Sequence, residues 1–285
     1  MNAVVADLLN SPTIEEVEYE YVNLAERYNT ISKLSRVGNL VVDYFTLEER
    51  LNTGMKGDVC FYDFLRDFDT WKMKKGVNRL YDDSPAKTHI KKVKSVYGMY
   101  VGMCHIFKPL QTLNILNTLT CNVAMLDPCA GWGGRLVGAS IKNIPRYIGI
   151  ESNKNLRDPY SRLSNFLQDK SHTQIDMRWC DALDIDYTKL DYDLVLTSPP
   201  YFNLEKYNGM RTYRTKHEWK EQFYKPVFTR IFESLRVGGA MALNINTELY
   251  VFFVLQFGIE SFRIQMDSRG RDNKYTEYVY VWIKR

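Results

Sequence analysis

Short apolar runs separated by polar stretches dominate the chain after residue 120. Each run is short and rich in branched or aromatic side chains, which is typical of a buried strand. Two later runs have no helix-length segment between them, so they are best joined as an antiparallel hairpin. The predicted strands cover residues 123–126, 147–150, 175–179, 194–197 and 240–245, and the predicted hairpin covers 261–266 and 278–283.

Helical spacing fills the gaps between these strands. Between the fourth and fifth strands, apolar side chains recur at Trp219, Phe223, Phe228, Ile231 and Leu235. Strands that alternate with helices form a parallel sheet covered on both faces. We therefore expect residues 121–285 to form a doubly wound, Rossmann-like α/β domain with an antiparallel last strand.

The first 120 residues carry mainly helical patterns. Helices are predicted at 14–28, 59–68 and 90–107, the first of them after the start signal Ser11-Pro12-Thr13. No Gly/Ser linker and no internal repeat divides the chain. We expect residues 1–120 to form a mainly helical region in front of the sheet domain.

Composition narrows the class of protein. Hydrophobic residues make up 45% and charged residues 25% of the 285 residues, which excludes a disordered chain. The five cysteines form no CxxC pair, so neither a zinc site nor a disulfide framework is expected. We read no signal peptide and no run long enough to span a bilayer. These features predict a cytoplasmic protein without a membrane or metal partner.

The charge is distributed unevenly. The net charge of +4 permits a polyanionic partner, and two basic clusters, in 72–94 and 206–216, stand out. Tyrosines interleave with the second cluster, which suits phosphate contact combined with base stacking, whereas a solvated face is the alternative. The predicted nucleic-acid contacts are Lys91, Lys92, Lys94, Lys206, Arg211 and Arg214.

A glycine-rich turn follows the first predicted strand, in LDPCAGWGGRLVG at 126–138. Glycine lets the backbone pass close to a ligand because no Cβ intervenes. A dinucleotide site fits poorly, since Leu136 stands where its third glycine belongs, and the lysine of a triphosphate-binding loop is absent. A purely structural tight turn remains the alternative.

Acidic residues end the next two strands. Glu151 can accept hydrogen bonds from a ribose diol, and Asp181 can accept one from an adenine amino group. Ligands in doubly wound sheets lie beyond the carboxyl ends of the strands. Together with the glycine turn, these positions have the layout of an adenosine pocket.

The fourth strand ends in TSPPYF at 197–202. Its two prolines fix the backbone and remove two donors. The Ser198 hydroxyl and the Pro199 carbonyl can then converge as acceptors on one amino group, with the flat ring of Tyr201 beside them. An ordinary turn is the alternative.

These motifs, taken in order, resemble the S-adenosylmethionine-dependent methyltransferases that modify exocyclic amino groups of nucleic-acid bases. The resemblance covers roughly residues 122–285 and implies a seven-stranded methyltransferase sheet. It implies that the methionine end of the cofactor is held by Asp127, Pro128, Ala130, Gly131 and Gly133. It places the ribose on Glu151 and the adenine on Asp181. It assigns catalysis on the target base to Ser198, Pro199, Pro200 and Tyr201.

The resemblance implies a DNA substrate whose target base is flipped out of the duplex, as in restriction–modification systems. Ser-Pro-Pro-Tyr favours cytosine-N4 as the methylated position. The alternatives are adenine-N6 of DNA, an amino group of an RNA base, and a non-catalytic subunit that binds nucleic acid.

Two departures from the family pattern matter. Cys129 replaces the usual phenylalanine, and we interpret it as loop packing rather than as a cytosine-C5 nucleophile, which would follow the fourth strand. No target-recognition domain fits between the motifs, so recognition is expected to fall to residues 1–120 and 203–216. The family also has a cofactor-binding motif on the N-terminal side of the glycine turn, and residues 84–89 are a candidate for it.

Overall fold

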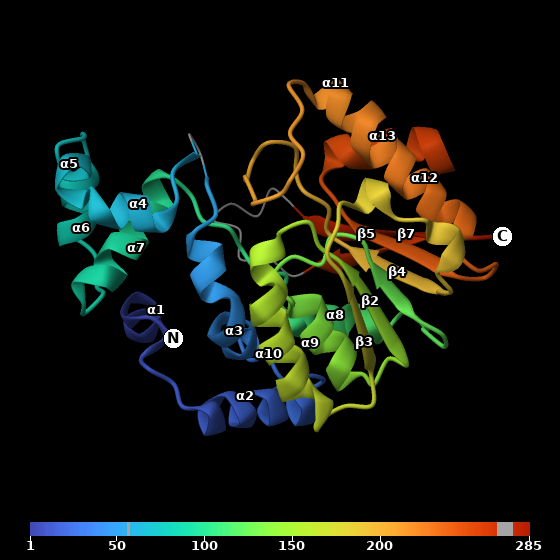
Figure 1. Ribbon diagram of the computed structural model, residues 1–285, viewed down its shortest axis with the longest axis horizontal. Helices are drawn as coiled ribbons and strands as arrows, with labels where there is room; N and C mark the ends of the chain where they lie inside the picture. The colour runs from blue at the N-terminus through green and yellow to red at the C-terminus, as the bar shows by residue number, and fades with distance from the viewer. Residues whose placement is uncertain (56–57, 267–275) are drawn as a thin grey trace.

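Seven strands form one mixed sheet in the computed structural model, which describes residues 1–55, 58–266 and 276–285 (Figure 1). The strand order is β3-β2-β1-β4-β5-β7-β6. Strands β1 to β5 are parallel, whereas β7 pairs antiparallel with both β5 and β6. The strands are β1 Met125–Asp127, β2 Arg146–Ile150, β3 Gln174–Arg178, β4 Leu194–Thr197, β5 Ala240–Asn244, β6 Phe262–Met266 and β7 Glu277–Ile283. The predicted fold class and the antiparallel last strand are confirmed; the connection between β6 and β7 lies largely outside the described residues.

The central strands are buried on both faces of the sheet, and neighbouring side chains along a strand point to opposite faces. Met125 of β1 lies in one hydrophobic core, and the next residue, Leu126, lies in the other. In β4, Leu194 and Leu196 belong to the first core and Val195 to the second. This explains why the strands were recognisable as continuous apolar runs.

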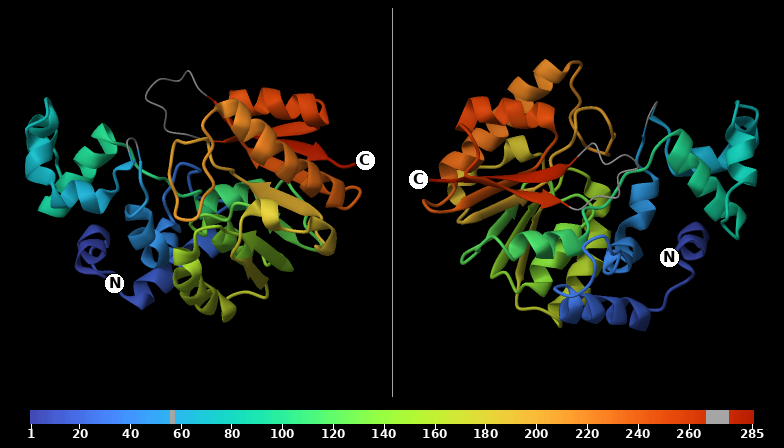
Figure 2. Two further views of the ribbon diagram at one scale, coloured as in Figure 1. Left: turned by 45° about the horizontal axis from the view of Figure 1, so that its top comes forward. Right: turned by 180° about the vertical axis from the view of Figure 1, so that it is seen from behind.

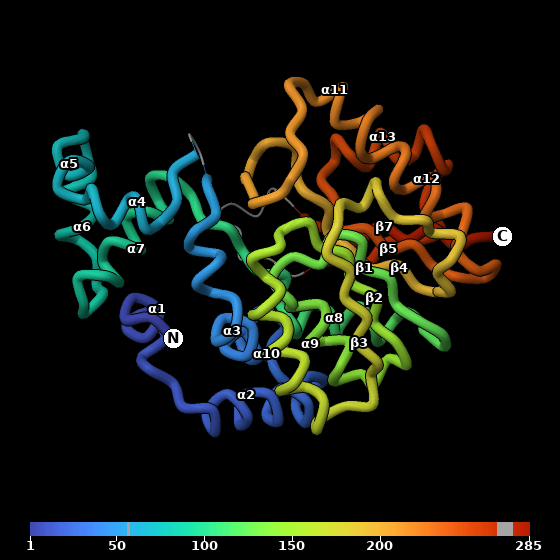
Figure 3. Tube along the Cα trace, in the orientation of Figure 1, coloured from blue at the N-terminus to red at the C-terminus, as the bar shows by residue number. Residues whose placement is uncertain are grey.

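Helices cover both faces of the sheet (Figures 1 and 3). One face carries α2 Ile14–Arg27, α3 Asn39–Leu51, α8 Pro109–Leu116, α9 Gly134–Ile141 and α10 Arg157–Gln168. The other carries α11 Lys216–Trp219, α12 Lys225–Ser234 and α13 Thr247–Phe257. The helix predicted between the fourth and fifth strands is confirmed, with a π-helical turn over Lys220–Tyr224.

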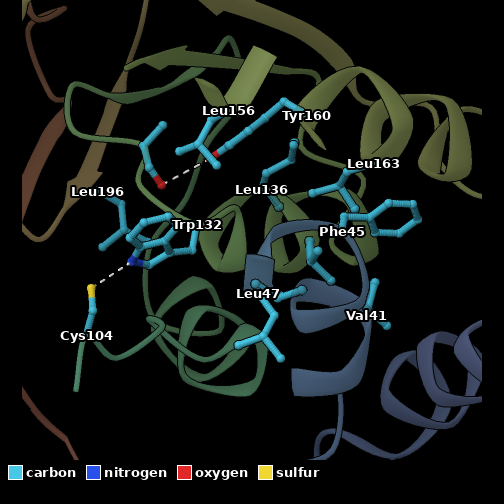
Figure 4. Packing of buried hydrophobic residues seen from close by; sticks show 14 of the residues in the cluster. Val41, Phe45, Leu47, Cys104, Trp132, Leu136, Leu156, Tyr160, Leu163 and Leu196 are labelled. Atoms are coloured by element: carbon cyan, nitrogen blue, oxygen red, sulfur yellow. Dashed lines mark hydrogen bonds between the residues drawn. The ribbon is translucent and has the colours of Figure 1, made fainter. Parts of the chain in front are cut away.

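The first core runs without interruption from the N-terminal helices to the sheet. Figure 4 shows Val41, Phe45 and Leu47 of α3 against Leu136 of α9 and Leu163 of α10. The Thr46 hydroxyl also donates to the Trp132 carbonyl at 3.2 Å, which fixes α3 against the glycine turn. Helix α3 therefore supports the predicted cofactor loop directly.

The remaining N-terminal helices build an arm that projects from the sheet (Figure 2). It contains α4 Phe61–Arg66, α5 Phe68–Lys72, α6 Val77–Asp82 and α7 His89–Tyr100, and α1 Ala3–Leu9 lies near its base. The arm has an aromatic centre, in which the rings of Phe64 and Trp71 lie 4.9 Å apart. None of the helices in the described ranges has the length and apolar character that crossing a bilayer requires.

Two predicted helix boundaries are wrong. The helix expected over 59–68 is divided at Asp67 into α4 and α5. The helix expected over 90–107 ends at Tyr100, because Gly102 follows in the left-handed region with a φ of 118°. By contrast, α2 begins as predicted, with a capping box between Thr13 and Glu16.

Candidate functional site

A cavity of about 1160 Å³ opens at the carboxyl ends of the central strands. It collects parts of all four motifs that the sequence suggested. The predicted site residues that line it are Pro128, Ala130, Gly131, Glu151, Asp181, Ser198, Pro199, Pro200 and Tyr201. The sheet brings them together because parallel strands end at one edge.

Asp127 does not line this cavity, contrary to the expected contact with the cofactor. Its side chain is 0% exposed, and its Oδ2 accepts hydrogen bonds from Arg135 Nε at 2.7 Å and from the Tyr147 hydroxyl at 2.8 Å. Arg135 also donates to the carbonyl of Cys129. Asp127 therefore holds Arg135, which in turn bonds to the backbone of the glycine turn at Cys129.

The two glycines of the turn have different roles. A Cβ on Gly133 would lie 2.9 Å from Leu163 Cδ2, so this glycine permits packing against α10. Contrary to the expected cofactor contact, Gly133 does not line the cavity. A Cβ on Gly131 would meet no atom closer than 3.9 Å. Both residues have positive φ, but only Gly131 leaves open space for a ligand.

Glu151 is held at the turn by two backbone groups. Its Oε2 accepts from the N–H of Gly131 and its Oε1 from the N–H of Asn153, each at 2.8 Å. Burial raises the pKa of this carboxyl to about 7, although both hydrogen bonds favour the ionised form. Each oxygen retains a lone pair that can accept from a ligand hydroxyl.

Asp181 is bridged to the loop after β4. Its Oδ1 accepts from the Leu183 N–H at 2.8 Å, and its Oδ2 lies 3.0 Å from Arg211 Nε. Arg211 also pairs with Asp184 at 2.7 Å. The predicted nucleic-acid contact Arg211 therefore lies beside Asp181 at the cavity, where it orients this acidic side chain.

The Ser-Pro-Pro-Tyr turn is fixed by hydrogen bonds from both sides. The Tyr201 hydroxyl donates to the Asn244 carbonyl at 3.0 Å and lies 3.5 Å from the Ser198 hydroxyl. On the other side, the Tyr224 hydroxyl donates to the Pro200 carbonyl. This arrangement places the Ser198 hydroxyl and the Tyr201 ring on one wall of the cavity.

Phe202, which follows Tyr201, does not line the cavity. It is only 9% exposed, has a φ of 56°, and packs edge-on against Tyr224. Two lining residues were missed instead: Asn244 at the end of β5 and Glu277 at the start of β7, joined by a hydrogen bond of 2.9 Å. Their positions at the ends of predicted strands were the signal that could have found them.

Cys129 lines the cavity, but its thiol is not activated as a nucleophile. Burial raises the pKa of its thiol well above the usual range, and Asp127 and Glu151 add to the effect. A thiol that stays protonated is a poor nucleophile. Among the described residues, no three His, Cys, Asp or Glu side chains gather as metal ligands.

Of the basic residues predicted to contact nucleic acid, only Lys94 and Arg211 border the cavity. Lys91 Nζ donates to Asn10 at 2.5 Å, Lys92 lies over the Tyr81 ring, and Lys206 pairs with Asp58 at 2.8 Å. Arg214 borders a separate, shallow pocket beside Tyr213. These four residues, on the arm and on the loop after β4, lie outside the cavity lining.

The segment 84–89 does not reach the cavity. Its Thr88 hydroxyl instead donates to Asp7 at 2.6 Å. The segment that does lie against the glycine turn precedes α8: the carbonyl of Phe107 is so close to Gly134 that a Cβ there would lie 1.7 Å from it. The suggested position of the additional cofactor motif is therefore wrong.

The strand order and directions are those of the class I methyltransferase fold. No protein-family model matches the sequence, and a search of curated proteins finds no match. Among solved structures, TrmN from Thermus thermophilus is similar over 62% of this chain and 49% of its own, with 15% identity and a TM-score of 0.44.

Two further solved structures are similar at the same level. An rRNA methylase from Streptococcus thermophilus matches 64% of this chain and 100% of its own, with 12% identity and a TM-score of 0.42. A tRNA m1G37 methyltransferase from M. jannaschii matches 62% of this chain and 47% of its own, with 13% identity and a TM-score of 0.40. This chain thus spans about half the length of two of the three.

Proposed function

We propose that this protein is an S-adenosylmethionine-dependent methyltransferase acting on the exocyclic amino group of a nucleic-acid base. One observation carries the proposal: the open glycine turn, the two acidic strand ends and the Ser-Pro-Pro-Tyr turn line a single cavity. If these motifs were only structural turns and isolated acidic residues, they would have no reason to line the same cavity.

The cofactor half of the cavity fits S-adenosylmethionine. Gly131 leaves the space that a Cβ would otherwise fill, so the methionine end can lie against the backbone there. The Glu151 carboxylate accepts the ribose hydroxyls, and Asp181 accepts from the adenine amino group. When bound, S-adenosylmethionine supplies an electrophilic methyl group.

The target half fits a flat base that carries an amino group. The Ser198 hydroxyl accepts a hydrogen bond from this group and so directs the nitrogen lone pair away from Ser198, towards the cofactor half. Tyr201, whose ring is held through its hydroxyl by Asn244, stacks on the base. Alignment of the two reactants supplies much of the rate enhancement.

The methylated base and the polymer are the finer part of the proposal. The Ser-Pro-Pro-Tyr sequence favours cytosine-N4, and DNA is the polymer that the sequence predicted, with RNA as the alternative. Two of the solved structures above carry rRNA and tRNA in their names, but at these TM-scores they do not decide the polymer. Nucleoside analysis decides it.

The deciding experiment supplies methyl-labelled S-adenosylmethionine with DNA and with RNA in separate reactions. Each polymer is then digested, and the methylated nucleoside is identified by its mass. N4-methylcytosine in DNA supports the full proposal, whereas N6-methyladenine or a labelled RNA amino group selects an alternative. Label on a ring carbon, or no label in either polymer, contradicts the proposed function.

Gly131→Ala is expected to weaken cofactor binding about tenfold, because its methyl group enters the space used by the cofactor. The positive φ adds a stability cost of roughly 1 kcal/mol. Calorimetry on the wild type and the variant measures the affinity. Gly133→Ala is the matched control: its methyl group meets Leu163 and should lower stability while leaving affinity nearly intact. Equal affinity in Gly131→Ala and the wild type would contradict the assignment.

Cofactor affinity is expected to fall as the pH drops below about 7, because the raised pKa of Glu151 leaves the carboxyl protonated there and less able to accept from the ribose. The fall should approach tenfold per pH unit. For the free protein, folding stability depends on pH with the opposite sign. A raised pKa contributes stability that is complete below the unfolded value and is lost as the pH rises through about 7. Calorimetry across this range, with Glu151→Gln as a control expected to show a flat profile, checks the prediction.

A further inference from the structure

The cavity extends well beyond the cofactor half. Its volume of about 1160 Å³ exceeds the roughly 300–1000 Å³ that is usual for one small ligand. Another part of its wall is built by the segment before α3, by α3 and α7, and by the segment before α8. The basic side chains on this wall, here called the basic compartment, are Arg36, Arg50, Lys94, His105 and Lys108.

Arg50 is the buried member of the basic compartment. It lies in the last turn of α3, is 9% exposed, and pairs with Asp43 on the same helix. Its Nε is buried and finds no hydrogen-bond partner among the described residues. A buried guanidinium donor without a partner is costly, so the site is suited to an incoming acceptor.

The basic side chains of the compartment lie close enough to affect one another's pKa. Burial, together with Arg50, Arg36 and the neighbouring Lys91, lowers the pKa of Lys94. Desolvation lowers the pKa of His105, and Arg50, Arg36 and Lys108 add to the effect. An anion in their midst would relieve this repulsion.

Two carboxylates, Asp43 and Glu205, also border the compartment. Asp43 is engaged by Arg50. Glu205 faces Arg50 from the loop after β4, but burial raises its pKa, and the Cys104 thiol donates to it at 3.2 Å. Even with both carboxylates counted, basic side chains outnumber acidic ones on this wall.

We propose that the basic compartment binds a backbone phosphate of the substrate strand, adjacent to the nucleotide whose base lies against Tyr201. This inference rests on the proposed function, since it takes the substrate to be a nucleic acid. One cavity joins the compartment to the Ser-Pro-Pro-Tyr turn. Arginine presents a planar fork of donors that matches phosphate oxygens. The compartment holds more basic side chains than a single cofactor carboxylate requires, and the volume leaves room for a nucleotide beside the cofactor.

The test uses Lys94→Gln and Arg36→Gln, which remove charge without unpairing a buried group. A third variant, Asp43→Asn with Arg50→Gln, removes both members of the ion pair together. Lys225→Gln is the matched control, since Lys225 lies on α12 in a surface pair with Glu221 and does not line the cavity. Binding of a labelled single-stranded oligonucleotide, in DNA and RNA forms, is titrated at several salt concentrations, and calorimetry measures S-adenosylmethionine affinity.

Each of the two single variants is expected to weaken strand binding five- to tenfold at low salt. The logarithmic salt dependence should flatten by about 0.7 per lost phosphate contact. S-adenosylmethionine affinity and Lys225→Gln should match the wild type. Loss of cofactor affinity with normal strand binding would assign the compartment to the cofactor carboxylate and overturn the proposal, as would no change in either.

A second measurement locates the phosphate. Oligonucleotides with one neutral methylphosphonate linkage, moved along the strand, are bound to the wild type and to Lys94→Gln. One linkage next to the target nucleotide should weaken the wild type and leave the variant unaffected. Equal losses in both proteins at every linkage would reject the contact. A wild type that binds in this pattern but methylates nothing would reject the proposed function alone.

Discussion

Replacing Ser198 by alanine is expected to slow methyl transfer about a hundredfold or more, on the order of 3 kcal/mol in the activation barrier. The variant loses the hydroxyl that we propose orients the target amino group; this hydroxyl lies 3.5 Å from that of Tyr201. Cofactor affinity should not change, because the cofactor residues lie on other strand ends. Single-turnover rates with saturating oligonucleotide, together with calorimetry, separate the two effects.

Thr197→Val is the matched control for this variant. The Thr197 hydroxyl is one residue away, fully buried, and has no hydrogen-bond partner in the described part of the chain. Its removal should leave both the rate and the fold intact. If Ser198→Ala turned over as fast as Thr197→Val, Ser198 would have no role in the chemical step.

Arg135→Met is expected to destabilise the fold by about 3–5 kcal/mol, because it leaves the Asp127 carboxylate buried with only the Tyr147 hydroxyl as a partner. Urea unfolding measures the loss. The double variant Asp127→Leu with Arg135→Met removes both charges and should recover most of the stability. A single variant as stable as the wild type would show that the ion pair does not hold the glycine turn.

The strands and the two main motifs were predictable because each depends on local sequence. Buried strands appear as apolar runs, and the Ser-Pro-Pro-Tyr turn carries its own backbone restriction at Pro199 and Pro200. Helix α3 was missed because its N-cap is Gly38, which offers no side-chain start signal, and because its apolar residues are not confined to one stripe.

Side-chain direction could not be predicted from the motifs. Asp127 and Gly133 occupy motif positions but do not line the cavity. Asp127 bonds to Arg135 on α9, and Gly133 lies against Leu163 on α10. The basic compartment was also out of reach, since Arg36, Lys94 and His105 come from three separate segments. Only tertiary packing brings such residues together.

The position of β7 has a consequence for the order of folding during synthesis. Strand β6 leaves the ribosome before β7, but its sheet neighbour is β7, which also pairs with β5 on its other side. Until β7 emerges, the edge of β5 is unpaired and β6 has no place in the sheet. Such open edges invite association between nascent chains. We therefore expect the sheet to close late, with β7 as the strand that completes it.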